Sequence, residues 1–179
     1  MAKQKQSDSD RQITGIAITA KGKIKITFNE ITEIPPVEGA EESTTDVNEY
    51  SIKTKRKPHK DLLDAMKKLR KDALAICEMN FDGKAIGSLN VIGIKITGDI
   101  VLRQSRVVMT IAKEVKRTGK QIEWSTPQVT MYGESEYEKA EEMSKLIQAL
   151  IDETWAYLDG KCEGESQLPL FPTVELATA

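Results

Sequence analysis

Basic residues gather in one stretch of the sequence. Between Lys53 and Lys71 there are nine lysines and arginines against two acids. Such a run could neutralise the phosphates of a nucleic-acid backbone, because bound lysine and arginine side chains release condensed counterions. The alternative is a solvated helix face whose charges pair with acids elsewhere, and the sequence favours neither interpretation. The candidate nucleic-acid-binding residues are Lys53, Lys55, Arg56, Lys57, Lys60, Lys67, Lys68, Arg70 and Lys71.

An acidic stretch follows later in the chain. Residues 134–153 contain seven acids against Lys139 and Lys145. If the basic and acidic stretches occupy equivalent positions in two related halves, one side of the molecule is basic and the other acidic. Charge asymmetry of this kind can also drive head-to-tail self-association, which would make a homo-oligomer.

Residues suited to catalysis or metal binding are sparse. His59 is the single histidine, and a general acid or base needs a partner and a pocket, neither of which the sequence identifies. A surface or helix-capping role is favoured. Cys77 and Cys162 lie far apart, which indicates neither a disulfide framework nor a zinc site, and motifs for phosphate loops or hydrolases are missing. We therefore expect no enzymatic activity, no cofactor and no metal.

The most specific motif stands near the C-terminus. The polar stretch 161–166 is followed by Gln-Leu-Pro-Leu-Phe at 167–171. This peptide resembles the bacterial sliding-clamp-binding motif, Gln-Leu-x-Leu-Phe, and departs from it at Pro169, where Ser or Asp is commonest. The resemblance implies that the clamp is contacted by Gln167, Leu168, Leu170 and Phe171.

The physical character of this peptide suits a docking segment. Leu170 and Phe171 form an apolar cluster on a polar tail, and such clusters usually occupy a pocket of a partner. Pro169 limits the conformational freedom lost on binding. The alternative is that the same apolar residues fold back onto their own domain as a strap.

The first half of the chain, residues 11–80, predicts strands followed by a helix. Apolar and polar residues alternate on both sides of a turn at residues 20–22, which indicates a β-hairpin with one buried face. After a loop rich in proline and polar residues, Tyr50 and Ile52 predict a short third strand. Pro58 then opens one long amphipathic helix.

The second half, residues 85–160, predicts the same order of elements, with a fourth strand as an alternative. Its last strand contains Pro127, which suits the edge of a sheet. The expected strands cover residues 89–96, 100–115 and 121–131.

A second long helix closes this half. Ser135 and Glu138 match a capping box, S-x-x-E, so the helix is expected to start at Ser135 and to run to about Leu158. Gly160 suits the left-handed residue that ends a helix.

The two halves are related by a near-constant offset. The strand beginning Gly15-Ile16 aligns with the one beginning Gly93-Ile94 at an offset of 78, and the two helix starts differ by 77. We predict an α+β fold of two similar β-β-β-α halves from an internal duplication, with antiparallel sheets and one long helix per half. Chance recurrence of isoleucine and leucine is the alternative. This element order resembles the Whirly and purine-rich-element-binding folds, which bind single-stranded nucleic acid.

Composition sets the broader class. With 179 residues, 39% of them hydrophobic and 30% charged, the chain suits one globular domain over residues 11–160. Residues 1–10 are expected to be disordered and 161–179 to form a flexible tail. No apolar run approaches the length of a membrane span and the N-terminus has no apolar signal core, so a cytoplasmic protein is expected.

Together these features predict a non-enzymatic accessory protein of DNA metabolism, from a bacterium or its phage. It would bind the replication sliding clamp through the C-terminal peptide and single-stranded DNA through the basic helix. The competing hypothesis is a structural or assembly protein, such as a phage particle component, whose tail docks on its own oligomer.

Overall fold

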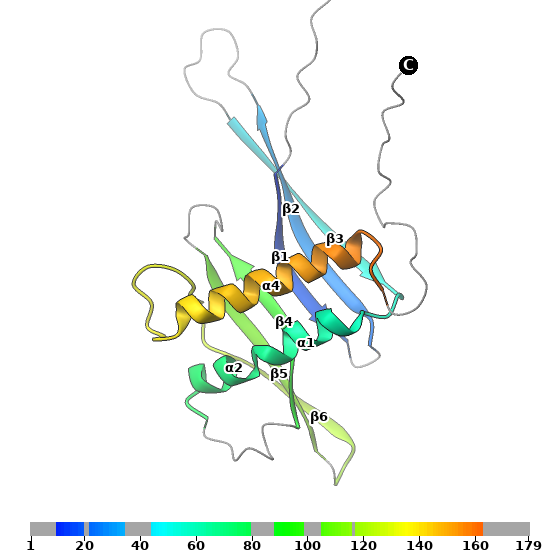
Figure 1. The fold of residues 1–179 in the computed structure, drawn as a ribbon, viewed down its shortest axis with the longest axis vertical. Helices are drawn as coiled ribbons and strands as arrows, with labels where there is room; N and C mark the ends of the chain where they lie inside the picture. The colour runs from blue at the N-terminus through cyan, green and yellow to red at the C-terminus, as the bar shows by residue number, and fades with distance from the viewer. Residues whose placement is uncertain are drawn as a thin grey trace, which may run out of the picture.

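The computed structural model describes residues 10–19, 22–34, 44–79, 88–98, 105–115 and 117–162. They form an α+β protein in which helices pack on one face of a single antiparallel sheet (Figure 1). No helix among these residues is long and apolar enough to cross a membrane. The elements are β1 (Asp10–Ile18), β2 (Ile24–Ile34), β3 (Thr44–Thr54), α1 (Lys60–Lys68), α2 (Arg70–Ile76), β4 (Leu89–Thr97), β5 (Arg106–Val115), β6 (Lys120–Ser125), β7 (Val129–Thr130) and α4 (Ala140–Leu158).

The sheet joins the two halves of the chain. Its strand order is β3-β2-β1-β4-β5-β6, with β7 paired to β5. Strands β1 and β4 meet at the centre, where Ile16 lies opposite Ile94. The expectation of more than one sheet is therefore wrong: each half leaves one edge of its first strand unpaired, and pairing these edges satisfies backbone groups that would otherwise be exposed.

The core lies between the sheet and the helices. In β2, Ile24, Ile26 and Phe28 are buried while Lys25 between them is exposed, which is the alternation expected of a strand with one covered face. Helix α1 buries Leu62 and Met66 with the adjoining Leu69, and α4 buries Met143, Ile147, Leu150 and Tyr157. Full burial of an aliphatic side chain is worth roughly 1.5–3 kcal/mol, so this layer holds the fold together.

The first half departs from expectation in two elements. Strand β3 has 11 residues and is not short. The helix expected to open at Pro58 begins at Lys60, and it is interrupted at Leu69, whose N–H bonds Met66 O only three residues back. The single long helix therefore becomes the two short helices α1 and α2.

The second half contains a false capping box. The Ser135 hydroxyl donates to Thr130 O at 2.7 Å and accepts from Tyr137 N at 3.2 Å, so it stabilises a turn before the helix. Helix α4 starts at Ala140 instead. The strand expected over 121–131 is split into β6 and β7 around Pro127, and β6 is an edge strand as predicted.

Candidate nucleic-acid interface and C-terminal anchor

The nine predicted nucleic-acid-binding residues are distributed over three parts of the fold. Lys53 lies near the end of β3, directly opposite Lys25 of β2. Lys55, Arg56 and Lys57 lie in the connection from β3 to α1. The remaining residues are on the two short helices: Lys60, Lys67 and Lys68 on α1, Arg70 and Lys71 on α2.

Lys67 and Arg70 have side-chain partners among the described residues. Lys67 Nζ lies 2.9 Å from Asp64 Oδ1, and this hydrogen bond lowers the pKa of the Asp64 carboxyl. Arg70 donates to Asn90 Oδ1 of β4. Asp64 therefore compensates part of the Lys67 charge, whereas the neutral Asn90 amide orients the Arg70 guanidinium without reducing its charge.

The basic and acidic stretches do not lie on opposite sides of the molecule. Helices α1 and α4 run antiparallel and side by side over the same face of the sheet (Figure 1), because both bury their apolar faces against it. The exposed acids Glu141, Glu142 and Asp152 of α4 are thus on the same layer as the lysines of α1. The expected separation of charge between two sides of the molecule is wrong.

The connection that carries Lys55–Lys57 is held by a buried hydroxyl. Tyr157 of α4 is fully buried, and its hydroxyl donates to Arg56 O at 2.8 Å. The Arg56 N–H in turn donates to Thr54 Oγ1 at 3.0 Å. Burial raises the pKa of Tyr157, so the hydroxyl keeps its proton and this hydrogen bond at neutral pH.

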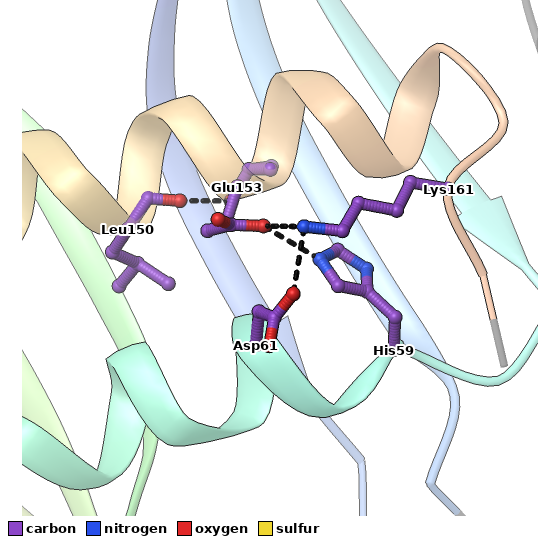
Figure 2. A network of polar contacts seen from close by, with 6 residues as sticks. His59, Asp61, Leu150, Glu153 and Lys161 are labelled. Atoms are coloured by element: carbon purple, nitrogen blue, oxygen red, sulfur yellow. Dashed lines mark hydrogen bonds and ion pairs between the residues drawn. The ribbon is translucent and has the colours of Figure 1, made fainter.

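A polar cluster fastens the C-terminal end of α4 to the start of α1, and Figure 2 shows its members pointing toward one another. His59 Nε2 lies 2.7 Å from Glu153 Oε2. Lys161 Nζ lies 2.7 Å from the same Glu153 oxygen and 2.8 Å from Asp61 Oδ2. We call these four residues the C-terminal anchor.

The role expected for His59 is corrected by this cluster. Its side chain is only 6% exposed, so it is not a surface residue. It occupies the residue before α1 but makes no side-chain capping bond to the helix. Its partner, Glu153, stands 94 residues away in the sequence, which is why the pairing could not be recognised from local pattern.

The charged groups of the anchor shift one another's pKa values, as expected of an ion-pair network. Hydrogen bonding to Lys161 lowers the pKa of Asp61, and hydrogen bonds from Lys161 and then His59 lower the pKa of Glu153. The same two carboxylates raise the pKa of Lys161. Ligand atoms of His59, Asp61 and Glu153 lie within 4.8 Å of one another, as a metal site would require. Because the Lys161 ammonium contacts both carboxylates, their charge is already compensated.

The backbone beyond α4 is fixed as well. Gly160 has φ +109°, Lys161 N–H bonds Ala156 O at 2.9 Å, and Gly160 N–H bonds Tyr157 O at 3.2 Å. These bonds form a Schellman motif and confirm the predicted helix end. Cys162 then makes an antiparallel bridge to Pro58. The expected tail over 161–179 therefore starts two residues too early, since Lys161 and Cys162 belong to the body.

Several predicted segments lie outside the described residues. They include the clamp-peptide residues Gln167, Leu168, Leu170 and Phe171, and residues 1–9 of the expected N-terminal segment. Asp10, which was expected to belong to that segment, is the first residue of β1.

The sequence did not reveal a hollow on the face of the sheet opposite the helices. Its volume is about 560 Å³, and strands β1, β2, β3 and β4 line it. Lys25 and Lys95 contribute positive charge to its lining. Each lysine stands between two buried isoleucines, in Ile24-Lys25-Ile26 and Ile94-Lys95-Ile96, and this pattern was the available signal that both point away from the core.

Other titratable groups have structural partners. Tyr137 donates its hydroxyl to Asp72 Oδ1 at 2.8 Å, and burial raises the pKa of Tyr137. Burial also raises the pKa of the Cys77 thiol, which is the opposite of what activates a cysteine nucleophile.

Comparisons of the chain with family models, curated proteins and solved structures found no match.

Proposed function

We propose that this chain is a non-enzymatic accessory protein of DNA metabolism, from a bacterium or its phage, that binds the replication sliding clamp. The observation that carries the proposal is the peptide Gln167-Leu168-Pro169-Leu170-Phe171, which resembles the clamp-binding motif. Its apolar side chains suit a pocket on a partner, and Gln167 can supply directional hydrogen bonds.

The anchor supports this proposal by fixing where the peptide is tethered. Cys162 is bridged to Pro58, and Gln167 follows five residues later. An extended chain spans at most about 3.6 Å per residue, so the peptide can start no more than roughly 18 Å from the bridge. A clamp bound there would hold the body close, on the side where the basic connection Lys55–Lys57 enters α1.

DNA binding through the basic residues is the second part of the proposal. Six of the nine are exposed lysines whose charge is available to phosphates: Lys53, Lys55, Lys57, Lys60, Lys68 and Lys71.

Clamp binding is tested by replacing Leu170 and Phe171 with alanine in the full chain. Hot-spot residues in a peptide pocket commonly contribute about 2 kcal/mol or more each, so replacing both should lower affinity for a purified bacterial clamp by roughly several hundred-fold. Biolayer interferometry with an immobilised clamp measures this. Thr173→Ala with Val174→Ala, just beyond the motif, is the matched control and should leave affinity unchanged. An unchanged affinity of the Leu170/Phe171 variant, or no binding by the parent protein, would refute the proposal.

The assembly protein is a second candidate because the far end of the β2–β3 hairpin exposes apolar side chains. Ile34 is 43% exposed and Val47 is 52% exposed, and β3 is an edge strand that can pair with another chain. Light scattering of the parent protein separates the candidates, since a large ordered homo-oligomer favours assembly and a monomer or dimer favours the accessory role.

We also propose that the two halves arose by duplication. Ile16 and Ile94, which the offset of 78 aligns, are paired at the centre of the sheet, and each half runs from strands to helix. At the offset of 77, Met66 corresponds to Met143, and both are buried in the helix layer. This supports a common origin for the two halves, which would have kept similar buried residues while their surface residues diverged.

A further inference from the structure

The open face of the sheet, opposite the helices, carries lysines from three separate strands. Lys25 of β2 is directly opposite Lys53 of β3, and Lys95 of β4 lies two strands away across β1. Residues paired across neighbouring strands point to the same face. Lys25 and Lys95 both line the hollow of about 560 Å³. The register therefore brings together three exposed charges that are far apart in the sequence.

The centre of the open face is built from small residues. Gly15, Ala17 and Gly93 come from the paired strands β1 and β4. A Cβ atom on Gly15 would lie 2.4 Å from Thr27 Oγ1, and one on Gly93 would lie 3.3 Å from Ile16 O. No large side chain occupies this centre, so a ligand can approach the strands between the lysines.

The charges of this face are unbalanced. Lys25 and Lys53 stand directly opposite each other, and like charges in that position destabilise a sheet. Within the part of the chain that the structure describes, none of the three lysines forms an ion pair with an acid. Glu49 is the single acid among the described residues that line the hollow. An anion between the lysines would relieve the repulsion.

The geometry points to the sugar-phosphate backbone of a single-stranded nucleic acid as the ligand of the open face. Lys25, Lys53 and Lys95 supply charge for phosphates, and Thr27, Asn29 and Thr97 at the hollow supply hydrogen bonds to phosphate and sugar oxygens. Its volume of about 560 Å³ is within the range of small-ligand sites, so it has room for a short stretch of an unpaired strand. Among the described residues of the lining no side chain is aromatic, so the contacts are with the backbone and binding is sensitive to salt.

This inference rests on the DNA-binding part of the proposed function and places the strongest contacts on the open face of the sheet, with the helix lysines as secondary contacts. It does not depend on the clamp peptide, so the two can fail separately. The helix lysines share their layer with the acids of α4, whereas Lys25 and Lys95 line a hollow and Lys53 stands directly opposite Lys25. We therefore expect the open face to bind the nucleic acid more strongly than the helix surface does.

Two triple variants of the full chain compare the surfaces. One is Lys25→Gln, Lys53→Gln and Lys95→Gln on the open face. The control is Lys60→Gln, Lys68→Gln and Lys71→Gln on the helices, which removes the same number of exposed charges. Fluorescence anisotropy of a labelled thymidine 30-mer is measured at several salt concentrations.

We expect the open-face variant to bind at least about tenfold more weakly at low salt and the helix variant to lose clearly less affinity, since its lysines lie outside the hollow. Each phosphate contact contributes about 0.7 to the slope of log affinity against log salt for a single strand, so three contacts should lower its magnitude by about 2. Loss in the helix variant alone, equal loss in both, no binding by the parent, or equal competition by a DNA duplex would overturn the inference.

A charge-reversal pair tests the hollow without touching the lysines. Ala17 is exposed at its centre, so Ala17→Glu should repel the phosphates and weaken binding, while Ala17→Arg should strengthen it. Thermal unfolding confirms that both variants are folded, and clamp binding is measured on the same samples. Equal affinities of the two folded variants would overturn the inference, and retained clamp binding would show that the proposed function stands without it.

Discussion

The covered and open faces of the sheet come from the same strands but are built from different residues. In β2, Ile24, Ile26 and Phe28 point into the core, while Lys25 and Thr27 between them point to the open face. The covered face excludes water and supplies the free energy of folding. The open face contributes little to that free energy, so its lysines and small residues are free to serve a ligand.

The largest difference in the free energy of unfolding is expected between substitutions at two neighbouring residues of β2, one on each face. Ile26 is 0% exposed, so Ile26→Ala should lower the free energy of unfolding by about 2–5 kcal/mol, through lost burial and the cavity left behind. Lys25→Ala should change it by no more than about 0.5 kcal/mol. The change should be stabilising, because it removes the repulsion with Lys53. Urea unfolding measures both, and similar losses would show that the open face is part of the core.

Local pattern was enough to predict which residues face the core. Alternating apolar and polar residues predicted the hairpin of β1 and β2, and the amphipathic pattern after Pro58 predicted a helix that buries one side, as Leu62 and Met66 do. Gly160 was recognised because only a left-handed residue closes a helix in this way, and its φ of +109° confirms it. Each of these features depends on residues within one element.

Pairings between distant elements could not be predicted. The centre of the sheet depends on β1 meeting β4, and the open-face lysines converge only through the registers of four strands. Ser135 illustrates a local failure, since its hydroxyl bonds Thr130 O and not the start of a helix. Whether a Ser-x-x-Glu motif caps a helix depends on the position and direction of the backbone at the end of the preceding strand, which the motif itself does not specify.

A buried hydroxyl on the covered side should give an intermediate effect. Tyr157→Phe removes the hydrogen bond to Arg56 O and leaves that carbonyl with one partner fewer. The expected loss in free energy of unfolding is about 1–3 kcal/mol. Tyr50→Phe is the control, because Tyr50 is 43% exposed and its hydroxyl can remain hydrated. Thermal or urea unfolding of both variants checks this, and an equal effect would mean that the Tyr157 bond does not hold the connection.

The C-terminal anchor lies at the rim of the covered face and should give the smallest effect, because its charges are partly exposed. The pKa values of Asp61 and Glu153 are lowered in the fold from ordinary values of 3.8 and 4.5. A lowered carboxyl pKa contributes stability above the ordinary value, and that stability is lost as the pH falls through the lowered pKa. Lys161→Met should therefore reduce stability at pH 7, and its difference from the parent should shrink as the pH falls through the lowered pKa values of the two carboxyls.

Lys145→Met is the matched control for this pH dependence. Its pair with Glu141, at 3.5 Å between side chains that are 73% and 84% exposed, is an ordinary surface contact on α4 and should contribute nothing measurable at either pH. Urea unfolding of both variants at pH 7 and pH 3 makes the comparison. If the Lys161→Met difference were as large at pH 3 as at pH 7, Lys161 would be acting through packing of its aliphatic stem. The anchor would then stabilise the fold by burial of apolar atoms, as the covered face does, and not by ion pairing.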